Sequence, residues 1–148
     1  MAYKRPVSVL VVIHTPALAV LLLERSRHPG FWQSVTGSQE NDEALIETAR
    51  REVGEETGIA AATSDFIDWQ LTNRYEIFAE WRGRYAPGVT HNTEHVFSLC
   101  VPEKVAVVIA PEEHLAWRWL PWNEAAAACF SWSNRDAVLE LPQRFSGG

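Results

Sequence analysis

The sequence predicts a layered α/β domain in which helices cover both faces of a β-sheet. Two apolar runs near the N-terminus, residues 7–13 and 18–23, show no alternation of apolar and polar residues, so we expect strands that are buried on both faces. Residues 42–57 have the composition of a helix, with an apolar face that can pack on these strands. Because the chain has 148 residues, we expect a single domain over residues 1–148.

Later segments supply the rest of the expected sheet. Residues 31–36 should form a short strand that leads into the acidic segment, and residues 66–81 a long strand or two strands. Residues 95–101 and 105–109 are further apolar segments. Leu and Trp alternate with Ala and Arg over residues 115–120, which predicts another strand.

Two short helices are expected near the C-terminus. Asn123 can cap the first, because Glu124 and four alanines follow it directly. Ser133 can cap the second, over residues 134–141. Pro142 should end this helix, because proline disrupts helical hydrogen bonding.

Composition argues against several classes of partner. The net charge is −6 and Lys and Arg form no run, so the electrostatic footprint of a protein that binds a nucleic-acid polymer is missing. No apolar run approaches the roughly 20 residues that span a bilayer, so we expect no membrane partner. Cys100 and Cys129 lack the spacing of a zinc site or redox motif and are interpreted as core thiols. These features are typical of a cytoplasmic protein.

The acidic segment at 37–59, GSQENDEALIETARREVGEETGI, carries more charge than folding alone requires. On a helix Glu52 neighbours Glu55 and Glu56, and like charges at this spacing cost about 0.2–0.5 kcal/mol per pair. A divalent cation would remove this cost, since Mg²⁺ accepts a few carboxylate oxygens and keeps positions for water and phosphate. Taken alone, an E-x-x-E-E pattern is more often a solvated acidic face. The complete segment favours a metal site.

This segment resembles the Nudix box at each of its specified positions. They are Gly37, Glu43, Arg51, Glu52, Val53, Glu55, Glu56, Gly58 and Ile59. The resemblance implies a Nudix hydrolase, an α/β/α sandwich with a mixed sheet between helices. Enzymes of this family use Mg²⁺ or Mn²⁺ to hydrolyse nucleoside diphosphates linked to another moiety. The resemblance also implies that Glu52, Glu55 and Glu56 bind the metal.

Two more residues enter the predicted catalytic group through the resemblance. Glu113 matches a distal acid that would complete the metal cluster, although its loop alone would be interpreted as solvated surface. Either Glu113 or Glu56 would take the proton from the attacking water. Arg51 is assigned a structural role in this group, either pairing with Glu47 along the helix or holding a box glutamate. None of the five histidines has ligand spacing, and none is assigned to the metal.

Segments outside the box narrow the resemblance. FWQSVTGS at 31–38, RYAPGVT at 84–90, NTE at 92–94 and SWSNR at 131–135 are similar to a bacterial branch of the family that acts on dihydroneopterin triphosphate in folate biosynthesis. The resemblance therefore implies hydrolysis of 7,8-dihydroneopterin 3′-triphosphate to the monophosphate and pyrophosphate. One alternative is a (d)NTP pyrophosphohydrolase that removes damaged or surplus nucleotides. A second is a non-catalytic binding module of the same fold.

The same branch implies a set of substrate-binding residues. They are Lys4, Arg25, Thr36, Tyr75, Glu76, Ile77, Phe78 and Ser131. Lys4 and Arg25 would bind phosphate, but cations at strand ends are as often simply solvated. Glu76 would accept N–H bonds from the ring while a neighbouring aromatic stacks on it, although such a strand is more often core on one face. Ser131 equally suits the start of a helix.

Overall fold

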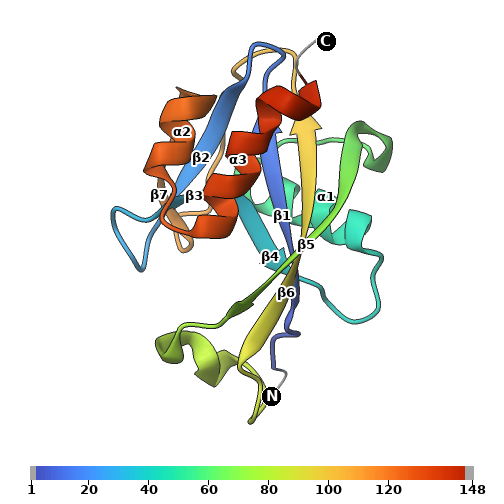
Figure 1. Cartoon of the computed structure of the whole chain (residues 1–148), viewed down its shortest axis with the longest axis vertical. Helices are drawn as coiled ribbons and strands as arrows, with labels where there is room; N and C mark the ends of the chain where they lie inside the picture. Colours follow the sequence, from blue (N-terminus) through green and yellow to red (C-terminus); the bar gives the residue numbers. More distant parts are fainter. Residues whose placement is uncertain (1–2, 146–148) are drawn as a thin grey trace.

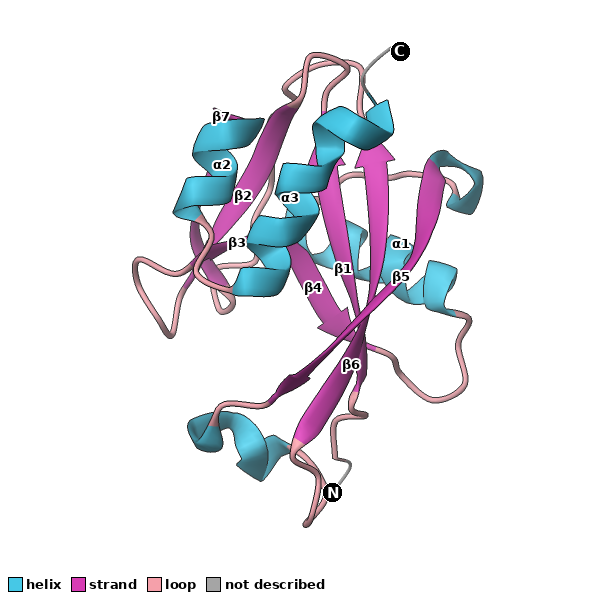
Figure 2. Cartoon of the chain, in the orientation of Figure 1, coloured by secondary structure: helices cyan, strands magenta, loops and turns pink. Residues whose placement is uncertain are grey.

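The computed structural model describes residues 3–145 and has the layered architecture expected from the sequence. One seven-stranded sheet lies between α1 on one face and α2 with α3 on the other (Figure 1). Figure 2 shows the strands as a continuous layer between the helices. No helix in the described part of the chain is long and apolar enough to cross a membrane.

The described residues form seven strands, three α-helices and two 3₁₀ helices. The strands are β1 (Val7–His14), β2 (Ala19–Arg25), β3 (Trp32–Gln33), β4 (Val35–Ser38), β5 (Phe66–Glu76), β6 (His91–Cys100) and β7 (His114–Pro121). The helices are α1 (Leu45–Thr57), α2 (Trp122–Ala128) and α3 (Trp132–Phe145), with 3₁₀ helices η1 (Thr63–Asp65) and η2 (Ala79–Arg84).

The central strand β1 makes the sheet mixed. It runs parallel to β6 and antiparallel to β4, where Val9 lies opposite Gly37. β2 pairs antiparallel with β7, and β5 pairs antiparallel with β6. This confirms the mixed sheet between helices. It also brings β4 directly beside β1, from where the chain passes into α1.

Alternate residues of β1 enter two separate cores, which explains its continuous apolar run. Val9 and Val11 pack with Ala49 and Val53 of α1 on one face. Leu10 and Val12 pack on the other face with side chains of α2 and α3. Burying each such side chain contributes about 1.5–3 kcal/mol relative to leaving it exposed. Both faces are therefore covered, as the absence of alternation predicts.

The helix boundaries differ from the sequence prediction. Helix α1 begins at Leu45, and α2 begins at Trp122 with Pro121 rather than Asn123 as its N-cap. Helix α3 begins one residue before Ser133 and continues through Pro142 to Phe145. The packing of Phe145 on the His14 ring, with centroids 4.7 Å apart, holds this last turn and offsets the lost hydrogen bond.

One strand prediction and one burial prediction also need correction. β5 ends at Glu76, whereas a strand was expected as far as residue 81, and η2 begins at Ala79. The apolar segment 105–109 forms no strand; Val107 enters the core and Val108 is 75% exposed. Cys100 is exposed rather than a core thiol; it is the last residue of β6.

Candidate active site

Helix α1 places its glutamates in two different environments. The side chains of Glu52 and Glu56 are 12% and 3% exposed and lie next to the buried face of the helix. Glu55 is 55% exposed, on the side that faces solvent. Gly58 ends the helix in the left-handed conformation (φ 76°), and its N–H bonds to the carbonyl of Gly54. The two buried carboxyls are thus fixed on a rigid element.

Glu52 and Glu56 share one polar environment. Burial, and then the hydrogen bond and charge of Glu52, raise the pKa of Glu56 well above its ordinary value. Burial also raises the pKa of Glu52, against the opposing effect of Arg51. Oε1 of Glu56 has no hydrogen-bond partner among residues 3–145. Two buried, adjacent carboxyls with an unpaired oxygen are a donor set that suits a hard divalent cation.

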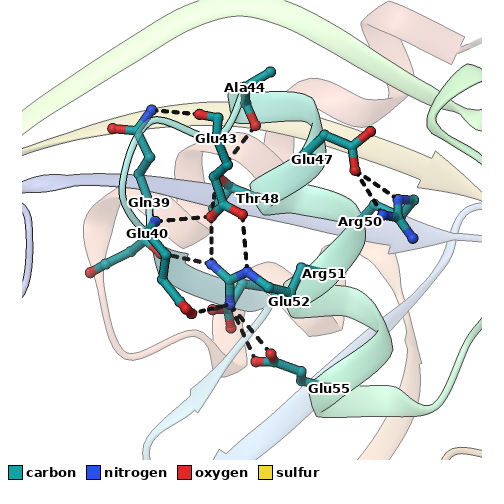
Figure 3. A network of polar contacts seen from close by, with 11 residues as sticks. Gln39, Glu40, Glu43, Ala44, Glu47, Thr48, Arg50, Arg51, Glu52 and Glu55 are labelled. Atoms are coloured by element: carbon teal, nitrogen blue, oxygen red, sulfur yellow. Dashed lines mark hydrogen bonds and ion pairs between the residues drawn. The ribbon is translucent and has the colours of Figure 1, made fainter.

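Arg51 holds one of these carboxyls from the solvent side (Figure 3). Its guanidinium donates to Glu52 Oε1 at 2.7 Å and to Glu43 Oε1 at 2.7 Å. It also donates to the Ser38 carbonyl at 3.1 Å, which ties the end of β4 to α1. Glu47 pairs with Arg50, three residues along the helix, and not with Arg51 as one of the two expected roles required. Arg51 therefore positions Glu52, which is one of the two roles expected of it.

Glu43 closes the loop that precedes α1. Its carboxylate accepts from Arg51, from the Glu40 N–H at 2.9 Å and from the Thr48 hydroxyl at 2.9 Å. The hydrogen bond from Arg51 is the main cause that lowers the pKa of Glu43 to about 2. The folded-state pKa therefore lies below the value of about 4.3 in an unfolded chain.

Glu43→Gln is expected to lower the free energy of unfolding by on the order of 2 kcal/mol at pH 7. The folded pKa is depressed, so the stabilisation is complete above about pH 5 and is lost as pH falls toward about 2. Urea unfolding of both proteins at pH 7, 5 and 4 measures the difference in their free energies of unfolding. This difference should begin to shrink at pH 4. Glu47→Gln, in an exposed pair with Arg50, should cost less than about 1 kcal/mol. An equal difference in free energy of unfolding between wild type and Glu43→Gln at every pH would contradict the lowered pKa of Glu43.

A charged cleft of about 490 Å³ opens over the two carboxyls. Its lining includes the carboxylates Glu52, Glu56 and Glu113 and the cations Lys4, Arg25 and Arg84. Partial burial, and then the positive charge of Arg84 and Arg25, lower the pKa of Lys4. Cations that repel one another beside a group of carboxylates form a site for a polyanion and its counter-cation.

Pairing of β2 with β7 delivers Glu113 and His114 to this cleft. His114 lies opposite Arg25 in the strand register, and the Ser26 N–H donates to the Glu113 carbonyl at 2.9 Å. His114 Nε2 is 3.8 Å from Glu56 Oε1. Burial, and then the charge of Arg25, lower the pKa of His114 to about 4, so the ring is neutral at pH 7. The sequence around His114 gives no sign of this position, because only the long-range register of β2 and β7 brings the ring to the cleft.

An aromatic pocket of about 220 Å³ adjoins the cleft. It is lined by the segment predicted to bind the ring, Tyr75, Glu76, Ile77 and Phe78, and by Ser131, a predicted substrate contact. Its lining also includes Trp81, Tyr85, Glu94, Phe130, Trp132, Ser133 and Asn134. The Phe78 and Trp81 rings meet edge to face with centroids 4.8 Å apart. Phe130 is stacked on Phe31 behind the pocket. Such walls suit a flat heterocycle.

The cleft and the aromatic pocket meet at three side chains. Arg25, Gln33 and Thr36 line both of them. Arg25 Nη1 donates to Gln33 Oε1 at 3.2 Å, and its guanidinium lies 4.7 Å from the centre of the Trp81 ring. These contacts hold the arginine between the carboxylates and the aromatic walls. One elongated ligand can therefore occupy both spaces.

The predicted metal ligands are not equally close to this junction. Glu55 lines neither space and contacts Arg51 at 3.4 Å. Within residues 3–145, no group of three or more His, Cys, Asp or Glu side chains is arranged so that it could hold a cation as it stands. Glu52 and Glu56 form a pair, and Glu113 faces the same cleft from the exposed loop before β7.

Comparison with known proteins assigns the family. The sequence matches the NUDIX domain family over residues 4–141. The chain belongs to the Nudix family. It is 50% identical over 142 residues to the dihydroneopterin triphosphate diphosphatase of Escherichia coli K12, covering 94% of this chain and 93% of that protein. It is 40% identical to the enzyme of the same name from Haemophilus influenzae, over 93% and 88% of the two chains.

A solved structure extends the similarity to the whole Nudix fold. The E. coli dihydroneopterin triphosphate pyrophosphohydrolase superposes with a TM-score of 0.88 and 46% sequence identity, and the alignment covers 100% of both chains. The expected fold and family are thereby confirmed.

Proposed function

We propose that this protein hydrolyses 7,8-dihydroneopterin 3′-triphosphate to the monophosphate and pyrophosphate, with Mg²⁺ as the metal cofactor. The single observation that carries the proposal is the junction of the charged cleft with the aromatic pocket at Arg25, Gln33 and Thr36. A triphosphate fits the chemistry of the first space and a pterin ring that of the second. The relatives from E. coli and H. influenzae, 50% and 40% identical, carry the corresponding activity in their names.

The residues in the cleft fit the divalent cation on which Nudix enzymes typically depend. Glu52 and Glu56 would hold it, with Glu113 as a third carboxylate. Glu55, on the solvent-facing side of α1, would be a further ligand only if its side chain turned toward the cleft. The unpaired oxygen of Glu56 is the main support for this fit. When bound, such an ion neutralises charge on the triphosphate and lowers the pKa of a coordinated water.

The protein's own side chains account for orientation and proton transfer. Lys4, Arg25 and Arg84 would bind the phosphate oxygens, and the aromatic pocket would fix the ring so that the triphosphate lies over the carboxylates. Glu113 is exposed at the rim of the cleft, and it would take the proton from the attacking water. Arg51 would act indirectly, by holding Glu52 in place.

Steady-state kinetics with dihydroneopterin triphosphate and a panel of dNTPs test the proposal. We expect Mg²⁺-dependent pyrophosphate release with the highest kcat/KM for the pterin substrate. A higher kcat/KM for any dNTP would instead support a nucleotide pyrophosphohydrolase. No release from any triphosphate, with or without Mg²⁺, would indicate a binding module.

A further inference from the structure

Glu94 is a buried carboxylate that the mechanism described above does not use. It lies on β6, is 2% exposed, and forms part of the wall of the aromatic pocket. The polar sequence around it, His91 to His95, gives no sign that this residue is buried. The long paired strands β5 and β6 and the start of α3 enclose it together.

The surroundings of Glu94 leave its charge only partly compensated. The Asn73 amide donates to its Oε1 at 3.5 Å, and Ser133 and Tyr75 also act as donors toward the carboxylate. No ion pair to Glu94 exists among residues 3–145. Burial raises its pKa, while the three neighbouring donors favour the ionised form. A buried carboxylate without a cation is costly, so a ligand that supplies donors would relieve the cost.

The shape and chemistry of the pocket define that ligand. Phe78, Trp81 and Phe130 favour a flat ring, and an ionised carboxylate has two oxygens that can accept two parallel N–H bonds. The pterin ring of the proposed substrate carries such a pair of donors, a ring N–H next to the 2-amino group. We propose that Glu94 recognises this amino–N–H edge and thereby determines specificity for the pterin ring; the inference rests on the proposed function.

Glu76 is the other carboxylate on the pocket wall, and the geometry disfavours it for this role. Its side chain is 67% exposed and pairs with Arg82 at 2.9 Å. The ion pair already satisfies the charge, and solvent competes for any remaining oxygen. Glu80, an exposed carboxylate on η2 that lines neither the cleft nor the aromatic pocket, therefore serves as the matched control.

Three proteins are compared: the wild type, Glu94→Gln and Glu80→Gln. With dihydroneopterin triphosphate we expect Glu94→Gln to lower kcat/KM roughly 10²-fold, because a bidentate acceptor becomes a mixed donor and acceptor. The loss should lie in KM, with kcat at saturation within about 3-fold, since the cleft is untouched. Glu80→Gln should change both constants by less than about 3-fold, because an exposed side chain outside the site makes no contact with the ligand. A loss confined to kcat, or equal losses in both variants, would overturn the inference.

Binding of the free ring separates this inference from the proposed function. Fluorescence titration with 7,8-dihydroneopterin needs no turnover, and we expect Glu94→Gln to weaken its binding roughly 10²-fold. Wild-type protein should also bind a ring analogue that lacks the 2-amino group more weakly than it binds 7,8-dihydroneopterin. This comparison tests recognition of the amino–N–H edge even if Glu94→Gln does not fold. Turnover without any preference for the amino-bearing ring would overturn the role of Glu94 alone. Ring binding that depends on Glu94 without triphosphate hydrolysis would overturn the proposed function alone.

Discussion

Replacing Glu56 with Gln is expected to lower the kcat of Mg²⁺-dependent pyrophosphate release by at least about 10³-fold, about 4 kcal/mol of activation free energy. Glutamine has nearly the same shape, so the packing at this buried position is retained. It lacks the charge that would bind a divalent cation, and its amide nitrogen would meet Glu52 as a donor. The variant should therefore fold and fail in catalysis.

Thermal unfolding distinguishes this loss from misfolding. A cation that binds only the folded wild type at 100 times its Kd would stabilise it by about 2.7 kcal/mol. Glu56→Gln should show no such gain on addition of Mg²⁺, while its melting temperature without Mg²⁺ stays equal or rises, because a buried repulsion is removed. Glu47→Gln, on the outer side of the same helix, is the control and should keep both activity and the Mg²⁺ shift. Retention of more than a tenth of the wild-type kcat by Glu56→Gln would refute the assignment.

The box helix could be predicted from sequence because its determinants are local. The spacing of Ala49 and Val53 sets the face that packs on the sheet, and this spacing places Glu52 and Glu56 beside that face. The orientation of Glu55 could not be predicted in this way. Proximity along the helix suggests a third ligand, yet its side chain projects toward solvent and Arg51.

The other half of the site depends on contacts that are distant in sequence. His114 reaches Glu56 only through the register of β2 and β7. Arg84 lines the cleft from the end of η2, beyond the strand expected over residues 66–81. Glu94 stands in a polar stretch whose burial depends on the meeting of β5, β6 and α3. Its string NTE was part of the family resemblance, but no local pattern gave it a role.

Replacing Gly37 with Ala should displace Glu52 and so disturb its pairing with Glu56. Gly37 lies on β4, and a Cβ added there would overlap the carboxylate carbon and neighbouring atoms of Glu52. The glycine is required by this close approach and not by its backbone angles, since its φ is not in the left-handed region. Forcing the contact apart should cost about 1–3 kcal/mol of stability. Displacement of Glu52 from Glu56 should lower kcat about 10²-fold, because small errors in catalytic positioning are costly.

A double-mutant cycle shows whether the clash with Glu52 is the cause. Glu52→Ala removes the side chain that the new methyl group meets, so Gly37→Ala should cost little stability in that background. Gly54→Ala is the control: it lies on α1, its added methyl would touch only the Ile59 carbonyl at 4.0 Å, and it should stabilise the helix by about 0.5–1 kcal/mol. Gly54→Ala should also leave kcat unchanged, because the change points away from both buried carboxyls. An equal loss of stability from Gly37→Ala with and without Glu52 would mean that the strand, and not the carboxylate, requires the glycine.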